Sequence, residues 1–337
     1  MSGLMCEFHL TRPRSTQDAV AAHREHAGSR FIAGGTDLLV NMRHGLGSAD
    51  LLIDLSGIAE LATITLDDNG ARIGAAVTLA ALARHPVIVA NYQAVAQAAE
   101  AVAAPGHRAL ATVGGNLCLD TRCIYYNQSE WWRKANGFCL KERGDVCHVA
   151  PQGRRCHAAF TGDLAPALLA LGAEVEIEGA HGRRQVPLGD LYVEDGRAHL
   201  ALGTDELVVA VHLPTDAPPS AYSKVRVRGA IDYPLAGVAV ALSAAHGVVS
   251  TLRIALTGTN SRPFALGGAD AIVGRPIDEK ALQEIDRLVQ KQVQPMRTTI
   301  ASAHYRRLSV AALARRLVAE LFAAAQSQAL ATSSQRA

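Results

Sequence analysis

The sequence predicts a mixed α+β protein, and three observations support this fold class. Short apolar strands alternate with helices over roughly the first two thirds of the chain. A Pro-rich break, TDAPPS at residues 215–220, interrupts that pattern. Beyond it, β-branched runs precede two amphipathic stretches, DEKALQEIDRLVQKQV and SVAALARRLVAELFAAA. This order is typical of helices packed on one face of a sheet.

The N-terminal part opens with a short strand at residues 30–35 that ends in a glycine pair. A helix follows at 36–45, with Thr36 or Asp37 as its N-cap and Gly45 as its stop. The further elements expected before the break are a strand at 50–58, a strand leading into a helix capped near Thr78 within 71–86, helices at 92–104 and 163–172, and strands at 173–179, 185–193 and 206–214.

The C-terminal part, from residue 221 onward, is expected to begin with strands on either side of a helix between residues 221 and 259. Helices at 278–293 and 309–325 follow, as their apolar periodicity indicates. The polar tail from Ser327 is expected to be frayed.

Composition excludes several classes of function. The 337 residues carry a formal net charge of +2, with acidic and basic residues interspersed, so a nucleic-acid stripe or a membrane-binding patch is not indicated. The longest apolar runs, such as residues 235–242, are too short to span a bilayer, and the N-terminus lacks a signal-peptide pattern. We therefore expect a cytoplasmic protein, in which thiols stay reduced.

Two glycine pairs resemble each other, in AGGTDL at residues 33–38 and TVGGNL at 112–117. Each is expected to end a strand, where glycine lets backbone N–H groups approach a ligand. Successive N–H groups that point the same way bind anions, and two such turns could hold a pyrophosphate. The alternative is two ordinary turns. Neither a GxGxxG nor a GxxxxGK[ST] motif is present in the sequence.

Five of the six cysteines fall within residues 118–156, a stretch that also holds both tryptophans. The intervals between Cys118, Cys123, Cys139, Cys147 and Cys156 are 4, 15, 7 and 8 residues, unlike the CxxC spacing of zinc knuckles. Such wide spacing favours a loop around an iron–sulfur cluster. Zinc, a disulfide and free thiols remain alternatives, with His107, His148 and His157 as possible further ligands.

Several segments together resemble the FAD-binding subunit of the xanthine oxidase (molybdenum hydroxylase) family over about residues 5–325. The segments are AGGTDLL, TVGGN, GDLAPALLALGAEVEI, AYSKVRVRGAIDYPLA and ASAHYRR. The loop motifs NQSEWWR and CHVAPQG resemble the 4-hydroxybenzoyl-CoA reductase branch of that family, and related aldehyde oxidoreductases also carry a cysteine loop at this place. The resemblance implies a two-subdomain (PCMH-type) FAD-binding fold and a C-terminal α+β domain like that of CO dehydrogenase flavoproteins.

The resemblance also implies domain limits and site residues. The FAD subdomains would span residues 1–57 and 58–217, with the cysteine insert at about 118–158, a C-terminal domain at 218–326 and a tail at 327–337. The implied FAD-binding residues are Phe31, Ile32, Ala33, Gly34, Gly35, Thr36, Asp37, Leu38, Val102, Thr112, Val113, Gly114, Gly115, Asn116, Asp163 and Lys224. The implied [4Fe–4S] ligands are Cys123, Cys139, Cys147 and Cys156, which leaves Cys118 packed beside the FAD site.

The function that the resemblance implies is electron transfer. The cofactors would be FAD and a [4Fe–4S] cluster, and no residue of this chain need act as a catalytic acid, base or nucleophile. The partners would be a molybdopterin-containing large subunit and a [2Fe–2S] small subunit, with a ferredoxin as donor. The most specific expectation is reductive removal of the ring hydroxyl of 4-hydroxybenzoyl-CoA. The alternatives are a subunit of an aldehyde or xanthine-type dehydrogenase, a stand-alone FAD oxidase and a zinc-stapled scaffold without enzymatic activity.

Overall fold

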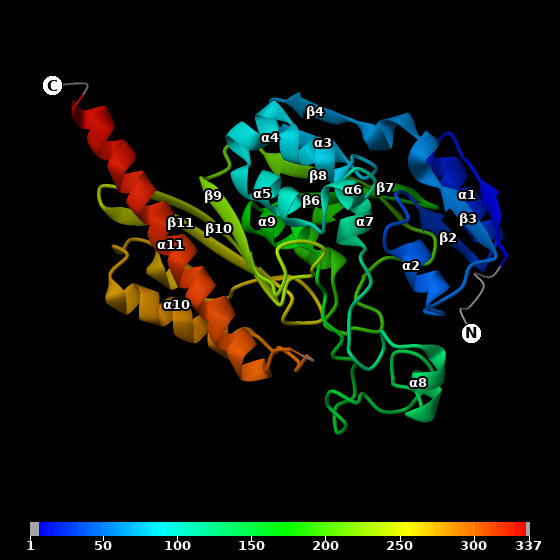
Figure 1. Cartoon of the computed structure of the whole chain (residues 1–337). Coiled ribbons are helices and arrows are strands. Elements are labelled where there is room, and N and C mark those ends of the chain that lie inside the picture. Colours follow the sequence, from blue (N-terminus) through cyan, green and yellow to red (C-terminus); the bar gives the residue numbers. More distant parts are fainter. Residues whose placement is uncertain (1–6, 299, 335–337) are drawn as a thin grey trace.

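The computed structural model describes residues 7–298 and 300–334, which form three sheets and the helices around them (Figure 1). A three-stranded parallel sheet has the order β1-β3-β2, a five-stranded antiparallel sheet the order β4-β5-β8-β6-β7, and a four-stranded antiparallel sheet the order β12-β11-β10-β9. The mixed α+β class expected from the sequence is confirmed.

The parallel sheet belongs to the N-terminal part of the chain. It is built from β1 (His9–Thr11), β2 (Ser29–Ile32) and β3 (Leu51–Asp54), with helices α1 (Thr16–Glu25) and α2 (Leu38–Arg43) between them. Ser15 begins α1 by accepting a hydrogen bond from the N–H of Asp18. The α2 helix begins after Asp37 and ends before Gly45, which has a φ of +68°. The strand, helix and stop expected from the sequence here are confirmed.

The antiparallel five-stranded sheet and its helices form the middle of the molecule. Its strands are β4 (Ile64–Asp67), β5 (Gly70–Gly74), β6 (Glu174–Gly179), β7 (Gly182–Pro187) and β8 (Leu207–Pro214). The helices are α3 (Leu79–Arg84), α4 (Pro86–Asn91), α5 (Gln93–Ala101), α6 (Pro105–Arg108), α7 (Val113–Leu117) and α9 (Leu164–Ala170), and the 3₁₀ turns are η1 (Leu55–Gly57), η2 (Ala59–Ala62) and η3 (Leu188–Leu191).

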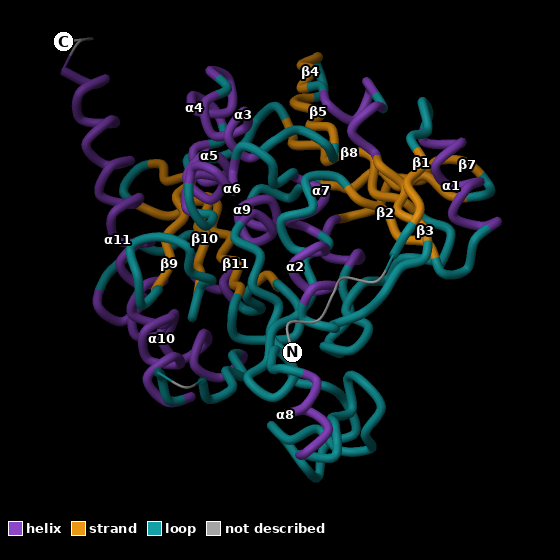
Figure 2. Tube along the Cα trace, turned by 45° about the vertical axis from the view of Figure 1, so that its right-hand side comes forward, coloured by secondary structure: helices purple, strands orange, loops and turns teal. Residues whose placement is uncertain are grey.

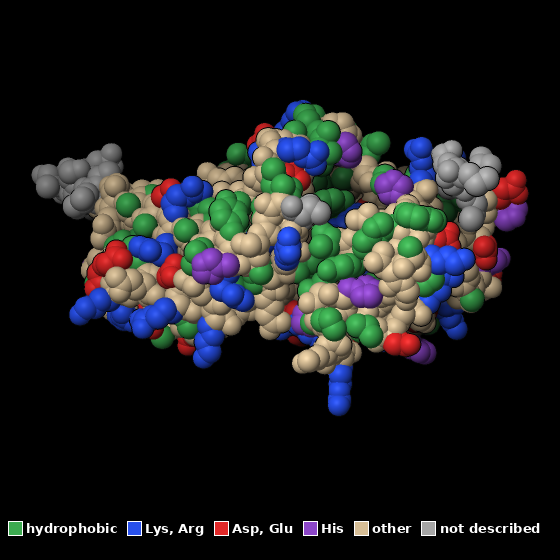
Figure 3. Space-filling model, turned by 60° about the horizontal axis from the view of Figure 1, so that its bottom comes forward, with side chains coloured by type: hydrophobic (Ala, Val, Ile, Leu, Met, Phe, Trp, Pro, Cys, Tyr) green, Lys and Arg blue, Asp and Glu red, His purple; other side chains and the backbone are tan. Residues whose placement is uncertain are grey.

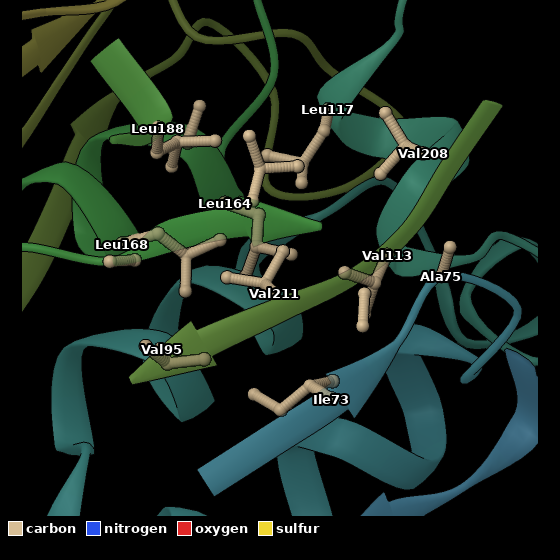
Figure 4. Close-up of a cluster of buried hydrophobic side chains, with 14 of the residues drawn as sticks. Ile73, Ala75, Val95, Val113, Leu117, Leu164, Leu168, Leu188, Val208 and Val211 are labelled. Atoms are coloured by element: carbon tan, nitrogen blue, oxygen red, sulfur yellow. The ribbon is translucent and has the colours of Figure 1, made fainter. Parts of the chain in front are cut away.

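Local sequence signals set several of these boundaries. Thr78 accepts a hydrogen bond from the N–H of Ala81 and so caps α3, as the sequence predicts. Between the sheet and its helices lies a continuous hydrophobic core (Figure 4). Ile73, Leu164 and Val211 lie within it and are fully buried.

The C-terminal part is a four-stranded sheet with two helices on one face. Its strands are β9 (Ser220–Val225), β10 (Ala236–Ala245), β11 (Val248–Thr257) and β12 (Phe264–Ala265), and its helices are α10 (Glu279–Gln292), α11 (Ala303–Ser334) and the 3₁₀ turn η4 (Ala269–Ile272). The strands β10 and β11 pair from Gly237 opposite Thr257 to Ala245 opposite Val248. Figure 2 shows α10 and α11 beside this sheet.

Two expectations for this part are wrong. The apolar run at 236–245 is the strand β10, not a helix between strands. Alternate residues of β10 belong to two different cores: Ala239 and Ala241 pack in the core that contains α9, and Val238, Val240 and Leu242 in the core that contains α11. Both faces of β10 are therefore apolar, and such a run has no periodicity that separates strand from helix. The tail expected to fray from Ser327 is helical as far as Ser334, and residues 335–337 lie outside the described part of the chain.

The cysteine insert, residues 118–158, forms a lobe at one side of the molecule (Figures 1 and 2). Its one helix in the structure is the short α8 (Glu130–Ala135), and the rest is loop. Arg133 anchors the lobe, because its buried guanidinium donates to Glu142 at 2.8 Å and to the carbonyl of Gly45 at 2.9 Å. That second bond joins the lobe to the end of α2.

The surface carries mixed charge. Figure 3 shows basic, acidic and histidine side chains scattered over one face, as the interspersed charges of the sequence predict. Within residues 7–298 and 300–334, no helix combines the length and the apolar character needed to cross a membrane.

One buried arginine ties α11 to the C-terminal sheet. The Arg306 guanidinium, 2% exposed, donates to the carbonyls of Leu235 at 2.8 Å, Met296 at 2.6 Å and Gly258. Burial lowers the pKa of Arg306 to about 10, still far above neutrality. Three backbone acceptors from three segments therefore depend on a single side chain.

Replacing Arg306 with Met should lower the free energy of unfolding by about 3 kcal/mol, because three buried carbonyls lose their donor. Arg307→Met is the matched control, since the Arg307 side chain is half-buried and makes no hydrogen bond or ion pair within the described residues; its effect should stay within about 0.5 kcal/mol. Urea unfolding followed by circular dichroism measures both. Equal losses of unfolding free energy in the two variants would contradict the anchoring role of Arg306.

Candidate functional site

A large cavity of about 880 Å³ lies between the parallel sheet, the middle sheet and the loop before β10. This volume is within the range of small-molecule and cofactor sites. The lining comes from four stretches of chain, which run within residues 29–47, 102–120, 197–208 and 231–233, with single contributions from elsewhere. Segments far apart in sequence therefore meet around one space.

The first glycine loop, Phe31–Leu38, lines this cavity with all eight of its residues. A Cβ on Gly34 would lie 1.8 Å from the carbonyl oxygen of Leu110, so only glycine permits this approach, and Gly35 has a φ of +67°. Among the described residues, no protein acceptor bonds the N–H groups of Gly34, Gly35, Thr36 or Asp37. The loop thus presents unpaired donors to the cavity, a suitable arrangement for an anion.

The second glycine segment, Thr112–Asn116, differs from the first. It is not a turn after a strand, because Val113–Leu117 is the helix α7 with Thr112 as its N-cap. The N–H of Gly114 donates to the carbonyl of Ala75 at 2.8 Å, and that of Gly115 to the Thr112 hydroxyl at 3.2 Å. These donors are already used, so the expectation of a second anion nest is wrong.

Parts of the second segment nevertheless reach the large cavity. Thr112, Gly114, Gly115 and Asn116 line it, as does Val102 at the end of α5. Val113 does not, because its side chain is buried in the hydrophobic core (Figure 4) and its N–H bonds to the carbonyl of Val77 at 3.0 Å.

A buried carboxylate lies beside the cavity at the start of α9. Asp163 lines the cavity, is 3% exposed and accepts a 2.6 Å hydrogen bond from the Tyr222 hydroxyl. The Lys224 ammonium, which does not line the cavity, lies 2.9 Å from the same carboxylate and also donates to the carbonyl of Asp232. Burial raises the pKa of Asp163, while the charge of Lys224 and the Tyr222 hydroxyl lower it. Lys224 therefore positions Asp163.

Two further residues that line the cavity are not among those expected from the sequence. The Thr161 hydroxyl and Nε2 of His199 are buried without a hydrogen-bond partner, and both residues line the large cavity. Burial lowers the pKa of His199 to about 4, so its ring is neutral near pH 7. No local motif marks either position. Buried polar atoms without partners are rare in folded proteins, so these two suit a polar ligand.

The fit of FAD to this cavity rests on these unpaired groups. FAD carries a pyrophosphate that needs donors, which the first glycine loop offers, and rings and hydroxyls that need single hydrogen bonds. The carboxylate oxygens of Asp163 retain lone pairs that can accept from a ligand hydroxyl. The residues present are thus compatible with FAD.

A second, smaller cavity is lined by four of the five cysteines of the insert. These are Cys123, Cys139, Cys147 and Cys156. Cys118 lines the large cavity instead, and burial raises the pKa of its thiol to about 12. The four that the family resemblance implies as ligands therefore lie together in the fold, although 32 residues separate the first from the last.

All five of these cysteines are free thiols, with no disulfide among them. Among the described residues, no three His, Cys, Asp or Glu side chains lie close enough together to hold one metal ion. Burial raises the pKa of Cys123 and of Cys156 to about 11, so both hold protons at neutral pH unless a metal replaces them. The cysteine cavity has a volume of about 10 Å³, which is room for one water molecule. The cysteine side chains would therefore have to move apart to bind a group larger than water.

The possible histidine ligands are distributed differently. His148 lines the cysteine cavity, but its Nε2 is 2.7 Å from the carbonyl oxygen of Phe138 and its ring packs on Tyr125. His107 lines the large cavity, and His157 lines neither.

Arg122 connects the cysteine insert to the first glycine loop. It donates to Asn41 at 2.9 Å and to the Tyr233 hydroxyl at 2.8 Å, and it forms an ion pair with Asp37. Because Asp37 and Tyr233 line the large cavity and Arg122 precedes Cys123, this one guanidinium joins the two candidate sites.

Comparison with known families matches almost the whole chain. The family model for the FAD binding domain in molybdopterin dehydrogenase matches residues 6–216, and that for the CO dehydrogenase flavoprotein C-terminal domain matches residues 220–321. The two matches follow one another along the chain, and together they cover the parallel, middle and C-terminal sheets.

Individual relatives agree with the family models. The aldehyde oxidoreductase FAD-binding subunit PaoB of Escherichia coli is 33% identical over 280 residues, covering 79% of this chain and 86% of the relative. The putative xanthine dehydrogenase FAD-binding subunit XdhB of Escherichia coli is 27% identical, covering 93% and 96%. A solved chain of CO dehydrogenase from Oligotropha carboxidovorans superposes with a TM-score of 0.78 at 26% identity, covering 95% and 99%. The chain therefore belongs to the family of FAD-binding subunits of the xanthine oxidase and CO dehydrogenase type.

Proposed function

We propose that this subunit holds FAD in the large cavity and a [4Fe–4S] cluster in the cysteine cavity, and that it passes electrons between them within a molybdenum hydroxylase-type complex. The observation that supports the proposal best is the gathering of four cysteines around one cavity that shares lining residues with the large one. When bound, FAD exchanges one or two electrons, whereas an iron–sulfur cluster exchanges one at a time.

The chain would hold FAD through residues from both subdomains. The free N–H groups of residues 34–37 would bind the pyrophosphate, and Asp163, held by Lys224 and Tyr222, would accept hydrogen bonds from FAD hydroxyls. Thr161 and His199 would supply further single hydrogen bonds. Gly114 and Gly115 of the helix α7 would form part of the wall around FAD.

The chemistry of the four thiols favours a cluster over zinc. Four thiolates on one Zn²⁺ lie about 3.8 Å apart, since each Zn–S bond is about 2.3 Å in a tetrahedron. In a cubane cluster each thiolate binds a different iron, so the sulfurs lie farther apart. Four cysteines line the common cavity, and their wide spacing in sequence, without a CxxC pair, favours the cluster. The ligands would be Cys123, Cys139, Cys147 and Cys156.

The most specific proposal is a subunit of 4-hydroxybenzoyl-CoA reductase. It rests on the loop motifs NQSEWWR and CHVAPQG. The reaction would take place on a molybdopterin-containing partner and would consume two electrons and two protons per 4-hydroxybenzoyl-CoA, giving benzoyl-CoA and water. A [2Fe–2S] small subunit would complete the complex, and a ferredoxin would supply electrons in the cytoplasm. The relatives PaoB and XdhB carry the names of an aldehyde oxidoreductase subunit and a xanthine dehydrogenase subunit. The alternative proposal is therefore a subunit of an aldehyde or xanthine-type dehydrogenase.

Thr161→Val should weaken FAD binding roughly two- to tenfold, the range expected for one lost hydrogen bond. The flavin-free chain should not lose stability, because the Thr161 hydroxyl has no protein partner to lose. Titration of the flavin-free chain with FAD, followed by flavin fluorescence, measures the affinity. Thr65→Val, at an exposed position of β4, is the control. An unchanged affinity would remove Thr161 from the site.

Cys139→Ser should abolish the iron content of anaerobically prepared protein, about four irons per chain in the parent, and leave FAD bound. Cys118→Ser is the matched control and should keep the iron, because Cys118 lines the large cavity. Metal analysis and the visible spectrum report both groups. Zinc without iron in the parent protein would refute the cluster, and loss of iron in both variants would refute the ligand assignment.

The assembled and reduced complex should be oxidised by 4-hydroxybenzoyl-CoA, with benzoyl-CoA as the product. Flavin absorbance during anaerobic mixing records the oxidation, and chromatography identifies the product. An oxidised complex that is instead reduced by an aldehyde or a purine, and that leaves 4-hydroxybenzoyl-CoA unchanged, would establish the alternative dehydrogenase.

A further inference from the structure

The large cavity and the cysteine cavity share two lining residues, Tyr126 and Lys141. We call this pair the shared wall. Tyr126 lies three residues after Cys123, and Lys141 lies two residues after Cys139, so the chain that carries two of the four thiols also forms the wall. Any groups bound in the two cavities would be neighbours across these side chains.

The Lys141 ammonium is held firmly in this wall. Its side chain is 5% exposed, and it donates to Asp120 Oδ1 at 2.7 Å, to the carbonyl of Thr121 at 2.9 Å and to the Thr121 hydroxyl. Its Nζ also lies 4.5 Å from the centroid of the Tyr126 ring. These contacts account for all three donors of the ammonium and leave little freedom of movement.

The charged side chains near the cysteine cavity differ in how far water screens them. Among the described residues that line it, Lys141 is the only one with a permanent charge. Asp120, its ion-pair partner, lines the large cavity, and its side chain is 35% exposed. Water screens the exposed carboxylate more than the buried ammonium. The nearby Glu142 carboxylate is paired with Arg133 at 2.8 Å. The Lys141 ammonium, buried in the wall of the cysteine cavity, therefore acts on a group bound there with less screening by water than either carboxylate.

We propose that Lys141 raises the reduction potential of the cluster held by the four cysteines and so sets how readily electrons move between the two cavities. The inference rests on the proposed function. Reduction adds one electron to the cluster, and a fixed positive charge in a poorly solvated site stabilises that added negative charge. Net charge and solvent exposure are among the factors that determine cluster potentials. Lys141 acts through its field and is not a ligand.

The test measures the midpoint potential of the cluster in the full chain, loaded anaerobically and titrated with dithionite and mediators. The signal of the reduced cluster in electron paramagnetic resonance reports the extent of reduction. Lys141→Met should shift the potential to a more negative value, because the charge is lost and the side-chain length is kept. Lys141→Arg should keep the potential close to that of the parent, because the charge is retained.

Asp120→Asn removes the opposing charge and should shift the potential to a more positive value. The double variant Lys141→Met with Asp120→Asn restores the charge balance and should return toward the parent potential, which a merely structural role of Lys141 would not produce. Should Lys141→Met fail to retain iron, Lys141→Gln removes the same charge and should show the same negative shift.

Two results would overturn the inference: an unchanged potential in an iron-loaded variant that lacks the Lys141 charge, or a potential of Lys141→Arg as negative as that of Lys141→Met. Both are distinct from failure of the proposed function, which would appear as a parent protein that binds no iron under the same conditions.

Discussion

The close contact between Gly34 and the carbonyl of Leu110 is the constraint on which the site depends. With a Cβ at residue 34 the two backbones could not approach, since that atom would lie 1.8 Å from the carbonyl oxygen. The contact places the first glycine loop of the parallel sheet against the chain that leads into α7. The large cavity exists between these two segments, and its unpaired donors come from the loop that glycine allows to come so near.

Two arginines attach the cysteine insert to the first glycine loop and to the end of the helix that follows it. Arg122 binds Asp37 and Asn41 beside the first glycine loop, and Arg133 binds the carbonyl of Gly45 at the end of α2. A lobe made mostly of loop has few apolar contacts of its own, so charged hydrogen bonds with planar geometry determine where it sits. Through Arg122 the insert is therefore in contact with the lining of the large cavity.

Three buried charged side chains of this protein each bind other groups of the fold. Lys224 neutralises Asp163 beside the large cavity, Lys141 lies between the two cavities, and Arg306 bonds three backbone carbonyls. An ion removed from water is costly unless its hydrogen bonds are satisfied, and each of these has several partners. By contrast, the unsatisfied atoms of Thr161 and His199 face the large cavity. Thr161 and His199 therefore differ from the three buried charges in having polar atoms without a protein partner beside the cavity.

The mixed α+β class, the cap at Thr78, the first glycine loop and the crowding of cysteines into one insert all follow from the amino-acid sequence. These features depend on neighbours in the chain: a cap bonds an N–H three residues away, and a periodicity is read within one segment. Family resemblance added the identity of the four grouped cysteines and of Asp163, which spacing alone left open.

Other features depend on contacts between segments that lie far apart in the chain. Whether an N–H group is free depends on which carbonyl the fold brings to it, so the second glycine segment became a helix with its donors used by Ala75 and Thr112. Burial on both faces made residues 236–245 a strand, because an apolar run without periodicity has no local preference to reveal. The shared wall of Tyr126 and Lys141 joins two cavities lined from distant parts of the chain, and such convergence exists only once long-range packing has formed.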